Sequence, residues 1–257
     1  MIKFFRKIRQ NLLSEGKTGK YFKYAIGEIV LVVIGILIAL SINNWNESRK
    51  EAIQEQFILT RLSADITSDI SQVSNEIDLI NKNSEELKFC IDVILRNKEA
   101  SITVFRDSLK SILNLISFDQ NKTTFNNLIS SGQIEYIQNQ NLTDSITKYY
   151  NHKYKGWDTA MLDYTRNIIA PFILNFDHAP QSTPGLAGYG DFTEVDIKQS
   201  KIPPKTIEEY RDEIFVLNML RQKLYNLEGQ KTAYKMLKMT MHQLIEQINL
   251  ELNARKK

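Results

Sequence analysis

The strongest constraint on this chain is an apolar segment near its N-terminus. Residues 29–40 are apolar throughout apart from Gly35. Residues 29–42 alone would form about 21 Å of helix, which is shorter than the roughly 30 Å of hydrocarbon in a bilayer. A start at residue 21 lengthens the helix to about 33 Å and leaves Trp45 at the outer interface. The sequence therefore predicts a transmembrane helix over residues 21–43.

The basic residues before this segment give it a direction. Residues 1–23 contain seven Lys and Arg against one carboxylate, Glu15. Because basic residues are retained on the cytoplasmic side, residues 1–20 are expected to form a cytoplasmic, basic, amphipathic tail on the anionic inner leaflet. Residues 44–257 then lie outside the cytoplasm. The residues expected at the membrane surface are Lys3, Arg6, Lys7, Arg9, Lys17, Lys20 and Lys23.

Two alternatives to this membrane interpretation were weighed. A cleaved signal peptide would place Ala39-Leu40-Ser41 at a small-x-small cleavage site, but the basic region before it is unusually long, which favours a retained anchor. Nucleic-acid binding is disfavoured because the net charge of +3 divides into +6 over residues 1–23 and −3 over the remainder. No nucleic-acid partner is expected.

The region after the span is expected to be helical. The chain contains only ten Gly and five Pro, and none of them lies between residues 36 and 131. Apolar residues then recur in steps of three and four, which predicts a long helix over about residues 46–96, continuous with the span. The series is Leu62, Ile66, Ile70, Val73, Ile77, Ile80, Leu87, Ile91 and Ile94, with Ser84 as its polar member.

Shorter helices are expected in the middle of the chain. The patterns predict one over residues 105–117, a second from Thr123 or Thr124 to a stop at Gly132, and a third of about thirty residues from Asn141 or Thr143. Pro171 should bend or end the third helix. Residues 175–205 read as a long loop.

A second long helix closes the sequence. Thr206 and Glu209 form a capping box, which predicts a helix of about 48 residues with Gly229 as its weak point. The predicted fold class is all-α, an N-terminal transmembrane helix continuing into an elongated antiparallel helical bundle. The core series of this helix is Ile214, Leu217, Leu220, Leu224, Leu227, Tyr234, Leu237, Met241, Leu244 and Ile248.

Three segments resemble a known family. They are residues 21–40 followed by Asn43-Asn44-Trp45-Asn46, the segment 124–132, and Tyr149-Tyr150. They are similar to an uncharacterised family of single-pass inner-membrane proteins of Bacteroidota. The resemblance implies a bacterial inner-membrane protein with a helical periplasmic domain, and it supplies no catalytic residues.

Glu28 is the sharpest candidate for a functional residue. A carboxylate within a span is expensive, at about 2.5–3.5 kcal/mol near the bilayer centre. Glu28 shares a helix face with Val32, Gly35 and Ala39, and Gly35-x-x-x-Ala39 permits close helix approach. The face is interpreted as an oligomer seam, with a hydrated carboxylate at headgroup level or an ion relay as alternatives.

A second candidate is an aromatic stripe. Tyr149, Tyr154 and Trp157 are a possible ligand groove, although aromatic residues at helical spacing more often form core. The histidines lack metal-ligand spacing. An acidic loop around His178 is a weak candidate for a cation site, so neither a metal nor a cofactor is expected. Cys90 is either an inert buried thiol or a cross-link between protomers.

No arrangement of residues predicts an enzyme. The leading interpretation is a non-enzymatic, membrane-anchored periplasmic scaffold or interaction subunit, oligomeric or bound to another membrane protein. A ligand sensor relaying through the transmembrane helix is the first alternative, and a subunit of an ion-driven complex using Glu28 is the second. A pocket lined by Tyr149, Tyr154 and Trp157 would favour the sensor.

Overall fold

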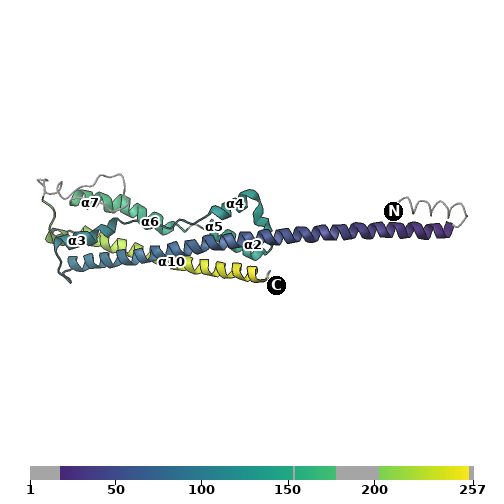
Figure 1. Ribbon diagram of the computed structural model, residues 1–257. Coiled ribbons are helices and arrows are strands. Elements are labelled where there is room, and N and C mark those ends of the chain that lie inside the picture. Colours follow the sequence, from purple (N-terminus) through teal and green to yellow (C-terminus); the bar gives the residue numbers. More distant parts are fainter. Residues whose placement is uncertain (1–17, 153, 178–202, 255–257) are drawn as a thin grey trace. The chain divides into compact units, whose positions relative to one another are not determined.

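The computed structural model describes residues 18–152, 154–177 and 203–254, and all secondary structure in these ranges is helical (Figure 1). The all-α prediction is confirmed. The chain divides into two compact units, residues 1–58 and residues 59–257.

The described part of the first unit is the beginning of one helix, α2, which runs from Thr18 to Ile94. The side chains of its apolar segment are exposed on all sides, with Leu31 62% and Leu37 57% exposed. The helix is long and apolar enough near its N-terminus to cross a membrane, which is compatible with a single span. The predicted continuity of this segment with a long following helix is confirmed.

In the second unit, α2 has one buried face. The fully buried side chains recur in steps of three, four and seven residues, as the sequence pattern predicts. Burying each of these side chains stabilises the fold by about 1.5–3 kcal/mol relative to exposure. The fully buried members of the predicted series are Leu62, Ile66, Val73, Ile80 and Leu87.

The C-terminal helix α10 spans Ile214–Ala254 and returns along this part of α2 in the opposite direction (Figure 1). It follows a short helix, α9, over Ile207–Asp212, which has the predicted capping box at Thr206. The prediction of one uninterrupted helix is wrong, because Glu213 has an extended backbone between α9 and α10. Its carboxylate accepts a hydrogen bond from the Phe215 amide at 3.1 Å, which caps the new helix start.

The middle helices pack on these two long elements. Gly132 has a φ of 71° and ends α4 as predicted. The helix predicted over residues 105–117 is shorter and ends in a 3-10 turn. The elements are α3 (Ile102–Leu109), η1 (Lys110–Leu113), α4 (Thr123–Ser131), η2 (Gln133–Tyr136), α5 (Gln140–Asn151), α6 (Gly156–Tyr164), η3 (Thr165–Ile169) and α7 (Ala170–Phe176).

The single helix of about thirty residues predicted from residue 141 is wrong. Asn139 caps α5 by accepting the Leu142 amide, and the helix ends where His152 becomes extended. The chain resumes in α6, passes through a π-helical turn and continues as α7. Pro171 lies just after that wide turn, which accommodates the missing N–H and the bulk of the ring, so Pro171 does not end the helix.

Candidate functional site

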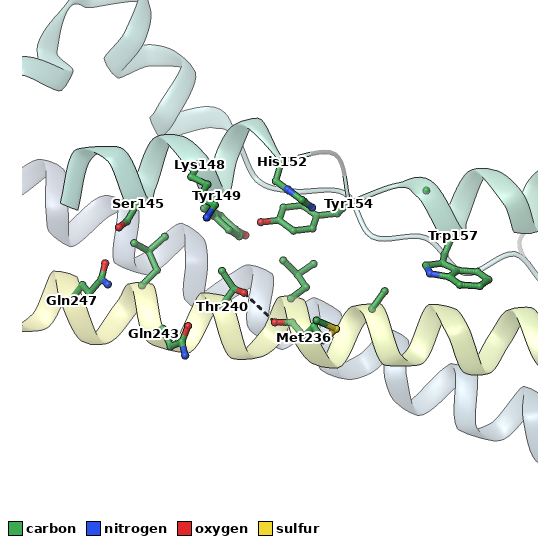
Figure 2. Close-up of a pocket in the computed structure, with 14 residues that line it drawn as sticks. Ser145, Lys148, Tyr149, His152, Tyr154, Trp157, Met236, Thr240, Gln243 and Gln247 are labelled. Atoms are coloured by element: carbon green, nitrogen blue, oxygen red, sulfur yellow. Dashed lines mark hydrogen bonds between the residues drawn. The ribbon is translucent and has the colours of Figure 1, made fainter. Parts of the chain in front are cut away.

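A pocket of about 610 Å³ lies between α10 and the α5–α6 segment (Figure 2). Ser145 and Gln247 lie at one end of it, and Trp157 lies at the other. The three aromatic residues singled out in the sequence, Tyr149, Tyr154 and Trp157, all line this pocket. The structure thus brings them together at one surface, and a ligand bound there stays a prediction.

At its end of the pocket, the Trp157 ring packs directly over a glycine of α10. A Cβ atom placed on Gly229 of α10 would lie only 2.4 Å from Cη2 of Trp157, so the indole occupies the space that a side chain would take. From the sequence alone, Gly229 is expected to weaken the helix that contains it. Its role is to let α6 approach α10, and an isolated Gly within a helical pattern was the available signal.

Tyr149 connects the pocket to α2. Its hydroxyl donates a hydrogen bond of 2.8 Å to Oδ2 of Asp69, while the backbone N–H of Asn121 donates to Oδ1 at 3.0 Å. Burial raises the pKa of Asp69 despite these two donors. Burial also raises the pKa of the Tyr149 hydroxyl, and the neighbouring Asp69 raises it further. Tyr149 therefore stays a neutral donor to α2.

Two of the three segments that resemble the uncharacterised family, residues 124–132 and Tyr149-Tyr150, meet beside this contact. Phe125, from the segment 124–132, stacks on Tyr150 with ring centroids 4.5 Å apart and planes 12° apart. The rings of Tyr150 and Tyr149 form a T-shaped pair, with their centroids 4.8 Å apart. Such pairs contribute about 0.5–1.5 kcal/mol beyond the area that they bury. The resemblance therefore marks packing residues behind the pocket.

Polar residues occupy core positions that the sequence analysis assigned to apolar neighbours. Asp69 is 1% exposed and Lys223 is 0% exposed, whereas the expected Ile70 and Leu224 are only half-buried. Gln230 is also fully buried in α10. All three polar residues fall on the alternating three- and four-residue steps of their helices. Their positions in the repeat of three and four residues were the available signal, if polar residues are also accepted at core positions.

Asp158 is the centre of a buried polar network. Its carboxylate accepts hydrogen bonds from the Tyr234 hydroxyl at 2.7 Å, the Gln230 amide at 2.7 Å and the Phe118 backbone N–H at 3.2 Å. Burial raises the pKa of Tyr234, and Asp158 raises it further. The network joins α6 to α10 directly after Trp157 and thereby fixes the position of the pocket wall.

Lys223 is a second buried polar centre. Its ammonium donates to the Asn114 carbonyl at 3.0 Å and to Oγ1 of Thr165 at 2.8 Å, at the start of the π-helical turn. Neither partner carries a charge. Burial therefore lowers the pKa of Lys223 to about 7.

A second pocket, of about 950 Å³, lies on the other side of the junction between α5 and α6. It is lined by residues of the segment 118–122 together with the junction itself. His152, Tyr154 and Gly156 line both pockets. The junction is thus the shared wall, and burial of Tyr154 within it raises the pKa of its hydroxyl to about 12.

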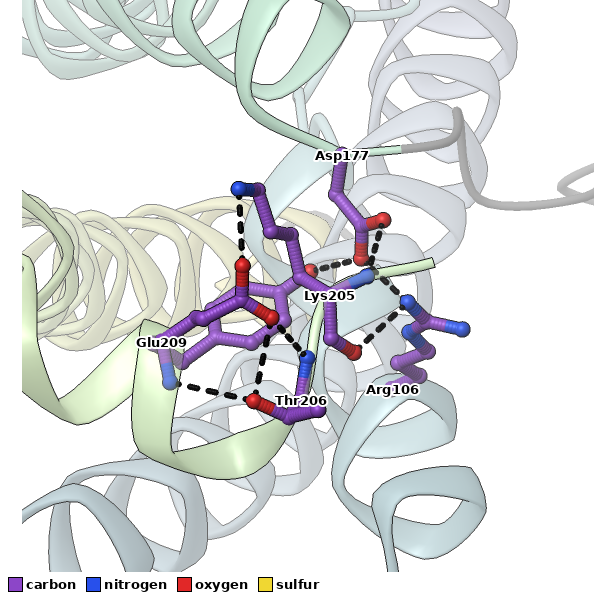
Figure 3. Close-up of polar contacts among 6 residues, drawn as sticks. Arg106, Asp177, Lys205, Thr206 and Glu209 are labelled. Carbon is purple, nitrogen blue, oxygen red and sulfur yellow. Dashed lines mark hydrogen bonds and ion pairs between the residues drawn. The ribbon is translucent and has the colours of Figure 1, made fainter. Parts of the chain in front are cut away.

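The ends of the segment 178–202 are held together by a polar clasp (Figure 3). Asp177, with a side chain only 2% exposed, accepts a hydrogen bond from the Arg106 guanidinium at 2.5 Å. It also accepts from the backbone N–H of Lys205 at 3.0 Å and from the Tyr210 hydroxyl at 2.6 Å. The predicted loop of residues 175–205 otherwise lies mostly outside the described residues.

Comparison with known proteins places the chain in a family. The DUF6090 family, a family of unknown function, matches residues 28–165, which is more than half of the sequence. The chain belongs to the DUF6090 family. No curated protein matches the chain, and no solved structure matches it. The expected resemblance to an uncharacterised family is confirmed to that extent, while the membrane and Bacteroidota assignments stay predictions.

The DUF6090 match covers only one wall of the pocket. It includes α5 and α6, as well as Asp69 and Tyr149, but α10 lies outside it. The hydrogen bond from Tyr149 to Asp69 thus lies within the region that defines the family, and the opposing wall does not.

The predicted seam residues lie together on α2 in the first unit. Val32 is 56% exposed, and a Cβ atom placed on Gly35 would have no neighbour within 4 Å. Glu28 and Ala39 belong to the same helix. Val32, Gly35 and Ala39 are exposed and Glu28 is half-buried, and the role of this face as an oligomer seam stays a prediction.

The basic residues expected at the membrane surface are described only in part. Lys3, Arg6, Lys7, Arg9 and Lys17 lie outside the described residues. Lys20 and Lys23 belong to α2, and the Lys23 side chain is exposed.

The remaining sequence candidates have simple environments. Across residues 18–152, 154–177 and 203–254, no three His, Cys, Asp or Glu side chains are grouped to hold a metal ion. The acidic segment around His178 lies outside those ranges. Cys90 is fully buried, its Sγ donates to the Phe105 carbonyl at 3.8 Å, and burial raises its pKa to about 12. The structure thus favours the inert thiol over a cross-link.

Proposed function

We propose that this protein is a membrane-anchored ligand sensor. A small molecule would bind in the pocket between α5, α6 and α10, and its binding would be transmitted to α2. The observation that carries the proposal is the hydrogen bond from Tyr149, a wall of the pocket, to Asp69 of α2. The sequence interpretation favoured a scaffold, and it named a pocket of this composition as the feature that would favour a sensor.

The pocket has the size and lining of a small-molecule site. Its volume of about 610 Å³ lies within the range of about 300–1,000 Å³ that is usual for such sites. Tyr154 and Trp157 are half-buried, so their rings are available to a ligand, whereas Tyr149 is almost fully buried. A ligand against the Tyr149 ring would therefore act on a side chain whose other end is fixed to α2.

The transmission would use the helix that also carries the apolar segment. Asp69 and the segment of residues 25–42 belong to the same helix, α2. A ligand shifts a conformational equilibrium only by its differential affinity for the two states. The two states proposed here differ in whether Tyr149 donates to Asp69 or turns away from it.

The proposed setting follows the charge pattern of the sequence. The protein would be a single-pass protein of a bacterial inner membrane, with residues 1–20 in the cytoplasm and the bulk of the chain in the periplasm. The basic tail would contact anionic lipids of the inner leaflet. The sensor would relay to a separate cytoplasmic partner, and it would not itself be an enzyme.

The test fills the pocket without presupposing a ligand. Met236 lines the pocket and is 65% exposed, whereas Met239 is 64% exposed on the same helix and does not line it. The full chain in nanodiscs would carry Met236→Cys, labelled with N-phenylmaleimide. Amide hydrogen exchange in α2 around Asp69 is expected to change. The same label on Met239→Cys should leave this exchange unchanged.

A second variant tests the transmission itself. Tyr149→Phe retains the ring but removes the hydroxyl that contacts Asp69. In this background the label at position 236 is expected to leave exchange in α2 unaltered. Equal responses with and without the Tyr149 hydroxyl, or equal responses to the labels at 236 and 239, would overturn the sensor proposal.

The scaffold expected from the sequence remains a second candidate, and one observation favours it. Tyr225, Met236, Met239 and Leu250 are each between 64% and 67% exposed, and at about 100° per residue they fall within a stripe about 60° wide on α10. An exposed apolar stripe of this kind suits association with a second copy or another membrane protein. Met239→Glu should then lower the mass of the detergent-extracted complex, as measured by light scattering.

A further inference from the structure

Polar side chains of the pocket lining gather toward one end, together with Tyr149 and Leu244, and Tyr154 and Trp157 lie toward the other end. The polar half lies between α5 and the last turns of α10, where Figure 2 shows Ser145, Lys148, Gln243 and Gln247. The aromatic half lies at the junction of α5 and α6, with Tyr154 and Trp157. A ligand that fills the pocket must therefore be polar at one end and apolar at the other.

The polar half has a positive charge and no opposing one. Lys148 is the one Lys or Arg among the residues that line the pocket, and the lining contains no Asp or Glu. Within the described residues, the Lys148 ammonium has no ion pair and no hydrogen bond. Gln243 and Gln247 line the opposite wall, on α10, and their side-chain amides also carry hydrogen-bond donors. This end of the pocket suits an anionic group.

The aromatic half is shaped for a flat group. The Trp157 indole packs directly over Gly229 of α10, so its flat ring forms a wall of this half. The Tyr154 ring and the flexible Met236 side chain line the same half. Aromatic faces favour a planar partner, and methionine adapts to irregular apolar shapes.

We propose that the pocket takes a small amphiphile with a flat apolar body and one anionic group, such as an aromatic carboxylate. The body lies between Tyr154, Trp157 and Met236, and the anionic group lies against Lys148. This inference rests on the proposed sensor function, because it names the ligand class of the same pocket. Aromatic rings also attract cations. Here the unopposed Lys148 disfavours a cation.

The test compares three probes of one shape and different charge. They are 2-naphthoate, 2-naphthamide and 2-naphthylmethylammonium. The full chain in neutral detergent would carry Trp45→Phe, which leaves Trp157 as its single tryptophan. Binding is measured by quenching of Trp157 fluorescence. The matched variants are Lys148→Gln in the pocket and Lys235→Gln on the exposed face of α10.

The naphthoate is expected to bind about fivefold more tightly than the naphthamide, which is the upper range for a solvent-accessible charge pair, and the cation should bind most weakly. Lys148→Gln should remove this preference, and Lys235→Gln should preserve it. Equal or tighter binding of the neutral or cationic probe overturns the anionic class and leaves the pocket as a ligand site. Binding of none of the probes overturns the class as well. The labelling of position 236 tests the sensor proposal separately, because it uses no ligand.

Discussion

The two parts of helix α2 differ in how their apolar residues are distributed and buried. Apart from Glu28 and Ser41, residues 25–42 carry no polar side chain and are mostly exposed, whereas residues 59–94 present one apolar face that is buried against other helices. In the first part, the described residues of the chain do not cover the apolar side chains. In the second part the surrounding is α10 and the middle helices.

The distribution of apolar residues along a helix indicates which surrounding the helix needs. A helix that is apolar at nearly every position needs an apolar surrounding on all sides. A helix with apolar residues in steps of three and four needs a packing partner on one face only. The second arrangement tolerates polar residues in the core when hydrogen bonds satisfy them, as at Asp69. The first arrangement contains one carboxylate, Glu28.

The largest effect is expected from core truncation in the second part. Ile66→Ala removes a fully buried side chain and should lower the free energy of unfolding by about 2–5 kcal/mol. The matched change Ile36→Ala, at a position 55% exposed, should leave unfolding of the second unit unchanged. Urea denaturation of the full chain in detergent, followed by circular dichroism, measures both. Equal losses would break the comparison.

The buried ammonium of the second part should make stability depend on pH. Because burial lowers the pKa of Lys223 from 10.5 to about 7, the unfolded chain binds this proton more readily between those values. The free energy of unfolding should rise with pH across this window, by at most about 1.4 kcal/mol per pH unit, and Lys223 should add no slope below pH 7. Lys223→Met should abolish this slope, and the exposed control Lys235→Met should retain it.

A smaller effect is expected from two glycines, one in each part of the comparison. Gly229→Ala forces the Trp157 ring to move and should lower the free energy of unfolding by about 1–3 kcal/mol. Gly35→Ala meets no atom within 4 Å and should leave unfolding of the second unit unchanged. In a Trp157→Leu background, Gly229→Ala should cost nothing further. A persistent loss there would mean that the indole is not the obstacle.

The smallest effect on stability is expected in the apolar part. Glu28→Gln and Gly35→Leu should leave unfolding of the second unit unchanged, because both residues lie in the first unit. If the predicted seam exists, both variants lower the mass of the detergent-extracted protein. An unchanged mass and an unchanged localisation would rule out the seam.

Much of the fold was predictable because it is governed by local rules. The capping box at Thr206, the stop at Gly132 and the absence of helix breakers in α2 each act within a few residues of sequence. The breaks at His152 and Glu213 were missed. At both places no Gly or Pro marks the end, and the backbone is set by how the next helix packs.

The candidate site was predictable only in its aromatic residues. Tyr149, Tyr154 and Trp157 stand out as a stripe, and the structure gathers them at one pocket. Their partners Asp69 and Gly229 are far away in sequence, and no local pattern links a tyrosine or a tryptophan to them. Lys148 became notable only once the pocket showed that no carboxylate opposes it.

The order of the residues was enough to predict that α2 is long, that its first part is almost entirely apolar, and that its second part has a buried face. Hydrophobic periodicity and chain breakers are written residue by residue, so they require no knowledge of neighbours. Only the tertiary structure decided which polar groups enter the core and where a pocket opens. These features depend on side chains that meet across tens of residues, where burial and hydrogen bonding replace local propensity.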